Sequence, residues 1–316
     1  MIDSVIVHRG REFPSYISDF VDQFYLFNQG NRLWIVTDAR FPELDELCRR
    51  HPDCRSVSAA ELEPTRHHRF FSRWNLMNST FRGGFWRFAV ERFFVLGDLM
   101  AAKDLGPVLH FEYDNMVYFD VAKLEAVLGD TSKGISLPAD STVRCIPSVV
   151  YIDGAAALAD FCRTYNLRYL LRRMNDMNAF SRYARDRKDR CSFLPVVPAW
   201  YKEGRDELRS RSGLATKDLG LLDRDFESFG GVFDAAAFGQ YLGGVDPRND
   251  AALGPGFVNE TAMYSAAEMP VRWERDDANR LVPIAEYGGR FFPIHNLHIH
   301  SKALHAFRSD RSVGGT

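Results

Sequence analysis

Two carboxylates stand at the end of an apolar run in the middle of the chain. The stretch VLHFEYDNMVYFDV, residues 108–121, begins as a buried strand does, and Glu112 and Asp114 follow two positions apart. Carboxylate oxygens are ligands for Mg²⁺ and Mn²⁺, and a cation held by one or two carboxylates can also bind substrate phosphates. The alternative is a pair of solvated acids just past a strand. We expect a divalent cation and a phosphate-bearing ligand here.

Three histidines, His295, His298 and His300, lie close together near the end of the chain, in HNLHIHSKAL. If LHIHSK is extended, the strand period of two places His298, His300 and Lys302 on one face. Because imidazole can ligate a metal and lysine can neutralise a phosphate oxygen, we expect this face to contact a metal and a phosphate. A self-contained zinc site made from all three histidines is the alternative. It would favour a hydrolase in which zinc activates water.

Strands and helices alternate in the first part of the chain. SVIVH and RLWIVTDA are typical of strands, and the apolar positions between them recur at helical spacing. This alternation predicts an α/β fold with a parallel sheet and helices on its faces. Ligands of such sheets bind beyond the carboxyl ends of the strands. His8, Arg9 and Asp38 fall at those ends.

The later elements are predicted in the same way. A helix is expected from about Phe85 to Ala102, directly before the strand that carries the two acids, and helical patterns run from about Ala155 to Arg187. The region from Gly230 to Gly256 is predicted as loop, apart from a short helix at DAAAFGQYL. PVRWE and LVPIAEY are predicted strands.

Composition sets the broad class. The chain has 316 residues, 46% of them hydrophobic, which can supply the core of one large α/β domain or two small ones. The formal net charge of −2 gives no reason to expect binding to nucleic acid. The five cysteines are irregularly spaced without a CxxC pair, and no apolar run has the roughly 20 residues of a membrane span. We expect reduced thiols, a cytoplasmic location and no transmembrane segment.

EYDNMVYFD resembles the DxD motif of GT-A glycosyltransferases, in the acidic-x-acidic-x-x-Val-x-x-Asp spacing of glycogenin and bacterial galactosyltransferase relatives. Glu112 occupies the first motif position, Asp114 the second and Asp120 the trailing one. The resemblance implies a single GT-A domain over residues 1–316, Rossmann-like, with a mixed, mainly parallel sheet flanked by helices. Its halves would be a nucleotide-sugar-binding half, 1–130, and an acceptor half with the C-terminal metal and phosphate segment, 131–316.

The resemblance also implies roles for residues. The metal, Mn²⁺ or Mg²⁺, would be held by Glu112, Asp114 and a C-terminal histidine, either His298 or His300. Asp234 would be the catalytic base if the enzyme inverts, with a helix cap as the alternative. The residues that it implies for the nucleotide sugar are His8, Arg9, Asp38, Arg92, Glu112, Tyr113 and Lys302.

The function expected from this resemblance is a metal-dependent glycosyltransferase of the hexosyltransferase type. It would move a sugar from a UDP- or GDP-linked donor to a hydroxyl acceptor, carbohydrate or other, in polysaccharide or glycoconjugate synthesis. One alternative is a histidine-liganded zinc hydrolase in which FEYD is structural. Another is a non-catalytic protein that binds nucleotide sugars.

Overall fold

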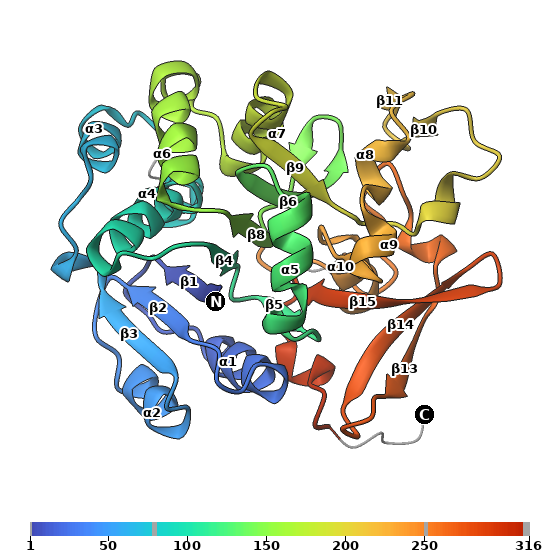
Figure 1. Ribbon diagram of the computed structural model, residues 1–316, viewed down its shortest axis with the longest axis horizontal. Helices are drawn as coiled ribbons and strands as arrows, with labels where there is room; N and C mark the ends of the chain where they lie inside the picture. The colour runs from blue at the N-terminus through green and yellow to red at the C-terminus, as the bar shows by residue number, and fades with distance from the viewer. Residues whose placement is uncertain (1, 78–80, 250–251, 312–316) are drawn as a thin grey trace.

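The structure, a computed structural model, describes residues 2–77, 81–249 and 252–311, and two sheets organise it (Figure 1). The strands of the larger sheet are Asp3–His8 (β1), Leu33–Thr37 (β2), Cys54–Ser58 (β3), Val108–Phe111 (β4), Ile135–Ser141 (β6), Arg144–Cys145 (β7), Val149–Ile152 (β8) and Cys191–Leu194 (β9). Their order is β3-β2-β1-β4-β8-β6-β7, with β9 beside β6.

Most pairings in the larger sheet are parallel. β1 pairs in parallel with β2 and β4, β2 with β3, and β6 with β9. The exceptions are β8, which is antiparallel to β4 and β6, and β7, which is antiparallel to β6. The predicted fold class, a mixed and mainly parallel sheet flanked by helices, is confirmed. β1, β2 and β4 therefore end at one shared edge.

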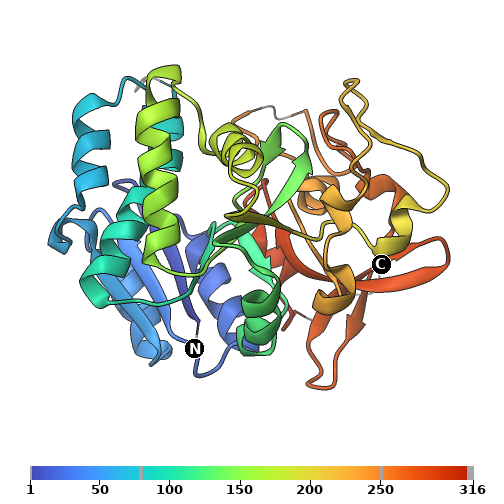
Figure 2. The same ribbon diagram turned by 45° about the horizontal axis from the view of Figure 1, so that its top comes forward.

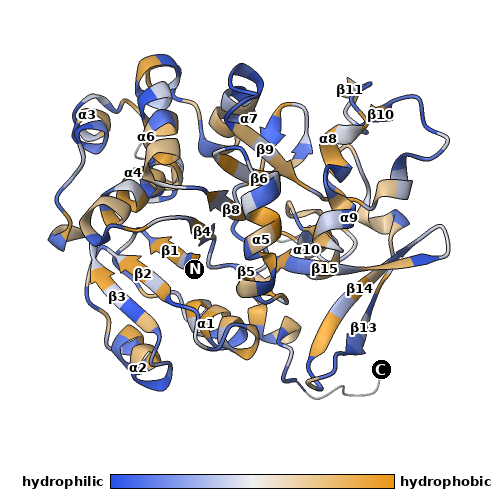
Figure 3. Ribbon diagram, viewed as in Figure 1, coloured by the Kyte–Doolittle hydropathy of each residue, from blue (hydrophilic) through white to orange (hydrophobic). Residues whose placement is uncertain are grey.

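Helices cover both faces of this sheet (Figures 1 and 2). They are Tyr16–Phe27 (α1), Pro42–Arg50 (α2), Arg66–Trp74 (α3), Phe85–Lys103 (α4), Val121–Thr131 (α5), Ala155–Thr164 (α6) and Asp176–Asp186 (α7). Side chains of β1 alternate between two cores: Ile6 packs with α1 and α2, whereas Val5 and Val7 pack with α4 and α6. Buried on both faces, β1 and β2 carry mainly apolar residues (Figure 3).

The smaller sheet joins the tail of the chain to its middle. Its strands are Asn115–Val117 (β5), Val232–Phe233 (β12), Val271–Arg275 (β13), Leu281–Tyr287 (β14) and Arg290–His298 (β15). β15 pairs with β14, β12 and β5, and the pairing with β5 is antiparallel. The remaining short elements are Leu208–Arg209 (β10), Ala215–Thr216 (β11), Gly220–Asp223 (α8), Phe226–Phe229 (α9) and Ala237–Gly243 (α10).

Local predictions hold best where periodicity is strong. The helix expected from Phe85 is α4, and PVRWE and LVPIAEY become β13 and β14. The helical pattern expected from Ala155 to Arg187 is interrupted, because a π-helical turn at Tyr165–Tyr169 and a left-handed Arg173, with φ of 50°, separate α6 from α7. No helix within the described ranges has the length and apolar character needed to cross a membrane.

Candidate metal centre

Strand pairing brings the tail of the chain to the two central acids. β4 ends at Phe111, and β5 begins three residues after Glu112. In the antiparallel register of β5 with β15, Asn115 lies opposite His298. The Ile299 backbone N–H then donates to the Asp114 carbonyl at 2.8 Å. The turn that carries Glu112 and Asp114 therefore lies beside His298, at the edge where β1, β2 and β4 end.

Buried amide side chains hold β5 and β15 together next to the two acids. Asn296 Nδ2 donates to Asn115 Oδ1 at 2.7 Å, and Asn115 Nδ2 donates to the Ser148 carbonyl at 2.9 Å. Asn296 Oδ1 accepts from the Asp234 backbone N–H at 3.1 Å. Since an unpaired amide in a fully buried position is costly, the hydrogen bonds specify one register between the two strands.

Three potential ligands converge at this point. His298 Nε2 lies 3.0 Å from Glu112 Oε2 and 3.1 Å from Asp114 Oδ1. The three ligand atoms, one from each residue, all lie within 4.8 Å of one another. Lys302 Nζ forms an ion pair with the second oxygen of Asp114. Two carboxylates and an imidazole are a donor set that fits a divalent cation.

Arg92 of α4 orients the first acid. Its guanidinium lies 2.5 Å from Glu112 Oε1 and 2.6 Å from Asp176 Oδ2, at the start of α7. Burial opposes ionisation of Glu112, but Arg92 and His298 outweigh it and lower the pKa of Glu112 to about 2. Glu112 is thus an anion with one oxygen on Arg92 and the other facing His298.

The electrostatics of His298 favour a positive charge between the acids. Burial opposes protonation, but the Asp114 and Glu112 carboxylates outweigh it and raise the pKa of His298 to about 10. Burial likewise opposes ionisation of Asp114, and the Lys302 and His298 charges hold its pKa well below the usual range. Among the described residues, His298 Nδ1 is buried without a hydrogen-bond partner. The two carboxylates therefore favour a positive charge at this point.

The other two histidines have different surroundings. His300 Nδ1 lies 2.8 Å from Gln240 Nε2, and its ring centroid is 4.4 Å from that of His298. His300 is therefore a neighbour of the group of three ligands rather than a member. β15 ends at His298, so Lys302 approaches Asp114 from a turn with φ of 65° and not from an extended strand.

His295 points to the opposite side of β15. Its Nε2 lies 3.1 Å from the Phe229 carbonyl, and its ring packs against Phe119 and Phe233. Burial lowers the pKa of His295 to about 4. Since positions 295 and 298 fall on opposite faces of a strand, the three histidines do not share one zinc site.

The residues expected at the ends of β1 and β2 form a separate cluster. Arg9 Nε lies 2.7 Å from Asp38 Oδ1. His8 Nδ1 lies 3.1 Å from the Tyr113 hydroxyl, and the Tyr113 ring stacks on Tyr16 with centroids 5.8 Å apart. Tyr113 stands between the two acids in the sequence, so this aromatic cluster adjoins the candidate metal centre.

The contacts of Asp234 match its helix-capping alternative. Its side chain is fully buried, and its oxygens accept backbone N–H groups of Phe238, Gly239 and His298 at 3.0, 2.7 and 2.9 Å. These bonds fix the start of α10 and the end of β15 and use both oxygens of the buried carboxylate. They favour the capping role of Asp234 over a role as catalytic base. Asp120 caps α5 through the Ala122 N–H.

Sequence reasoning missed several supporting residues. Asp176 binds Arg92, Gln240 binds His300, and Asn296 joins Asn115. A signal existed for Asn296, which is an amide inside an otherwise buried strand segment. Asp176 gave no signal, because its partner lies 84 positions away.

The likeness of this chain to known proteins is found among solved structures. No family model and no curated protein matches the sequence. Mouse xyloside xylosyltransferase 1, in its apo form, is 10% identical over 65% of this chain and 90% of that chain, with a TM-score of 0.43. The galactosyltransferase LgtC in complex with donor and acceptor sugar analogs is 12% identical over 65% and 78%, with a TM-score of 0.42. The glycosyltransferase GlyE of Streptococcus pneumoniae TIGR4 is 12% identical over 61% and 45%, with a TM-score of 0.40.

Proposed function

We propose that this protein is a metal-dependent glycosyltransferase that uses a nucleotide-diphosphate sugar as donor. One observation carries the proposal. At the carboxyl edge of the sheet, His298 from the end of the chain lies within hydrogen-bond distance of both Glu112 and Asp114, and Lys302 pairs with Asp114. A cation site next to a lysine is better suited to binding a metal together with a diphosphate than to binding a metal alone.

Each residue of the site has a separate proposed role. Glu112, Asp114 and His298 would hold Mn²⁺ or Mg²⁺, which when bound offsets the charge that develops on a leaving diphosphate. Arg92 keeps Glu112 ionised and oriented. Lys302 would contact a phosphate oxygen. His8, Arg9, Asp38 and Tyr113, around the ends of β1, β2 and β4, would bind the nucleotide.

Lys302 predicts that the cation and the diphosphate bind cooperatively. Its ammonium now pairs with Asp114. A divalent cation on the same carboxylate would repel this ammonium, and a diphosphate would supply it with a new anionic partner. Each ligand should therefore raise the affinity of the other by the same factor. We propose a UDP- or GDP-linked hexose as donor and a hydroxyl of a polysaccharide or glycoconjugate precursor as acceptor.

The test combines ligand binding with turnover. We expect Mn²⁺ and UDP or GDP together to raise the melting temperature more than the sum of their separate effects. Asp114→Asn should abolish this synergy and lower metal-dependent donor hydrolysis or transfer by ~10²- to 10³-fold. The matched control is Asp120→Asn, which alters another acid of the same motif but keeps a capping side chain.

Two results would refute the proposal. The first is turnover in Asp114→Asn near that of the wild type, with the variant folded. The second is tight zinc in protein purified without added metal, together with no response to nucleotide diphosphates, which would favour the hydrolase. A synergy of binding without sugar release from any donor in a panel would identify a non-catalytic binder.

A further inference from the structure

Two segments far apart in the sequence form one exposed face. Residues 66–77 contain α3, and residues 163–175 contain the end of α6 and the turns that follow it. Asn166 Nδ2 donates to the His67 carbonyl at 2.9 Å, and the ring of Tyr165 packs in the same interface. α3 and α6 stand side by side in both orientations (Figures 1 and 2). We call the exposed part of the two segments the docking face.

α3 is held firmly, so the docking face has a defined shape. Asp98 of α4 accepts from the Thr65 backbone N–H at 2.7 Å and binds His68 Nδ1 at 2.5 Å. Glu91 lies 3.4 Å from His68 Nε2. Burial opposes protonation of His68, but the two carboxylates outweigh it and raise its pKa to about 9. A protonated His68 therefore fastens α3 to α4 at neutral pH.

Large apolar side chains point outward from the docking face. Phe70, Trp74 and Leu76 are exposed in the first segment. Leu167 and Leu171 of the second segment are 71% and 79% exposed, the highest values among the exposed large hydrophobic residues. Side chains of this size gathered on one surface usually mark a contact with another apolar phase or a partner.

The same face is strongly basic. The segments RHHRFFSRWNLM and RTYNLRYLLRRMN hold seven arginines and no acid, although the whole chain has a net charge of −2. Arg66, Arg73, Arg172 and Arg173 are exposed, and within residues 2–77, 81–249 and 252–311 no carboxylate pairs with them. The face therefore offers unneutralised guanidinium groups among its apolar side chains.

We propose that the docking face binds the surface of a lipid bilayer that carries anionic headgroups. Arginines attract such headgroups, and Trp, Phe and Leu can enter the headgroup and acyl boundary beneath them. Nucleic acid would pair with the arginines but would leave Leu167 and Leu171 without an apolar partner. A second copy across a twofold axis would bring arginines against arginines. A bilayer satisfies both kinds of side chain.

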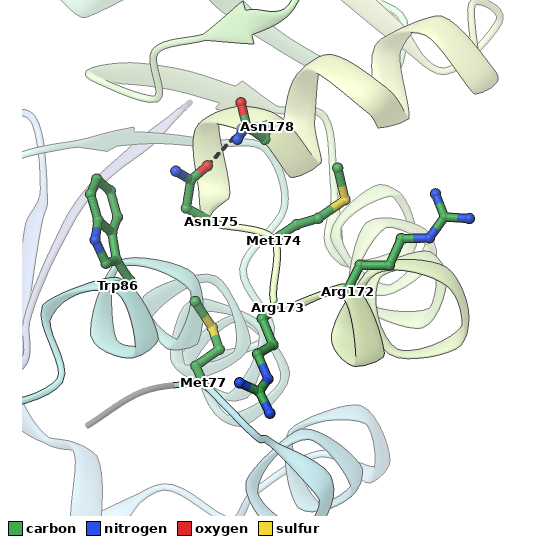
Figure 4. A pocket seen from close by; sticks show the side chains of 7 residues that line it. All are labelled: Met77, Trp86, Arg172, Arg173, Met174, Asn175 and Asn178. Atoms are coloured by element: carbon green, nitrogen blue, oxygen red, sulfur yellow. Dashed lines mark hydrogen bonds between the residues drawn. The ribbon is translucent and has the colours of Figure 1, made fainter. Parts of the chain in front are cut away.

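A cavity lies at the border of the docking face. The cavity has a volume of about 370 Å³, and its lining includes Met77, Trp86 and Arg173 (Figure 4). Asn175, also in the lining, directly precedes Asp176, which binds Arg92. Docking would thus place this cavity at headgroup level. The proposal for the docking face does not depend on sugar transfer.

The test is sedimentation with vesicles of phosphatidylcholine alone or of an equimolar mixture with phosphatidylglycerol. We expect the protein to bind the anionic vesicles and to be released as salt rises. Arg73→Gln with Arg172→Gln should weaken binding about 30-fold, five- to six-fold for each charge. Leu167→Asp with Leu171→Asp should weaken it at least about 10-fold.

Two matched double variants serve as controls. Arg211→Gln with Lys217→Gln removes two exposed charges outside the docking face, and Val143→Asp with Phe291→Asp alters two exposed apolar side chains outside it. Both should bind as the wild type does. Thermal unfolding of every variant shows whether it is folded.

Several outcomes would overturn the proposal. They are the absence of binding to anionic vesicles, equal losses in the control variants, and tighter binding to single-stranded RNA than to vesicles. A concentration-dependent dimer that the leucine variants abolish would assign the face to a second copy instead. These binding results are independent of turnover, so a failed docking face and a failed transferase can be told apart.

Discussion

Gly239→Ala is the substitution with the most direct link between helix packing and the candidate metal centre. Gly239 lies in α10, where the end of β15 crosses it. A Cβ at this position would lie 1.9 Å from the His298 carbonyl oxygen and 2.5 Å from the carbonyl carbon. Ordinary contacts between carbon and oxygen are about 3.3 Å or more. Either α10 or the backbone of His298 must therefore move by more than about 1 Å.

The energetic consequence follows from what surrounds the clash. Both atoms belong to the backbone, and Asp234 ties the Gly239 and His298 N–H groups to one carboxylate oxygen. Alanine would favour the helix by up to about 1 kcal/mol, but overpacking costs about 1–3 kcal/mol or more. Because the clash is with backbone atoms, we expect the upper end of this cost and a net loss of about 2 kcal/mol or more, which lowers the melting temperature by roughly 5 °C. Displacement of His298 should weaken Mn²⁺ binding by about 10- to 100-fold.

The assay is thermal unfolding together with Mn²⁺ titration, with and without UDP or GDP. Gly243→Ala is the control in the same helix. Its Cβ would meet Ser301 Oγ at 3.1 Å and the Phe307 ring at 3.4 Å, which are side-chain atoms that can shift. This variant should stay within about 1 kcal/mol of the wild type and keep its Mn²⁺ affinity. Wild-type stability and metal affinity in Gly239→Ala would refute the packing that places His298 in the centre.

Three further predictions follow from buried charges. The wild type should be about 2 kcal/mol more stable than His68→Gln below pH 6.5, with solvent screening allowed for. Because the folded-state pKa of His68 is raised to about 9, this difference in stability should vanish as the pH rises from 6.5 to 9. Urea denaturation across this pH range measures it. Arg92→Met should lower the free energy of unfolding by about 3–5 kcal/mol, since the buried Asp176 and the partly buried Glu112 lose their partner. Arg87→Met on the same helix should change it by less than about 1 kcal/mol. Lys302→Met should weaken UDP or GDP binding about tenfold in calorimetry but leave Mn²⁺ binding to Asp114 at least as tight, because the competing ammonium is gone.

Much of the fold follows from local patterns in the sequence. The apolar runs of β1, β2 and β4 identify strands whose burial is nearly complete, and the periodicity of α4 identifies a helix that is buried from Val90 to Leu96. Alternation of such strands and helices leaves few topologies, and a shared carboxyl edge is common to them. The position of Glu112 and Asp114 at that edge was therefore predictable.

Spacing alone did not predict which of the histidines faces the two acids. A period of two places His298 and His300 on one face only while the strand continues, but β15 ends at His298. His300 then bonds to Gln240, which lies 60 positions earlier. Likewise, an aspartate near a helix start has the same local signature whether it caps the helix or faces a substrate, and only the bonds of Asp234 to Gly239 and His298 distinguish these roles.

The geometry of the candidate metal centre depends on the register of β15 against β5, and no local sequence pattern specifies that register. Slipping β15 by one residue against β5 would turn His298 away from Glu112 and bring Leu297 toward the acids. Apolar packing would oppose this slip, and the buried bond between Asn115 and Asn296 adds a specific penalty, because this bond would be lost inside the core. Polar residues in the core thus set the register, and the register sets the distances among the ligands. A substitution of Asn296 should consequently disturb the metal centre even though Asn296 contacts neither acid.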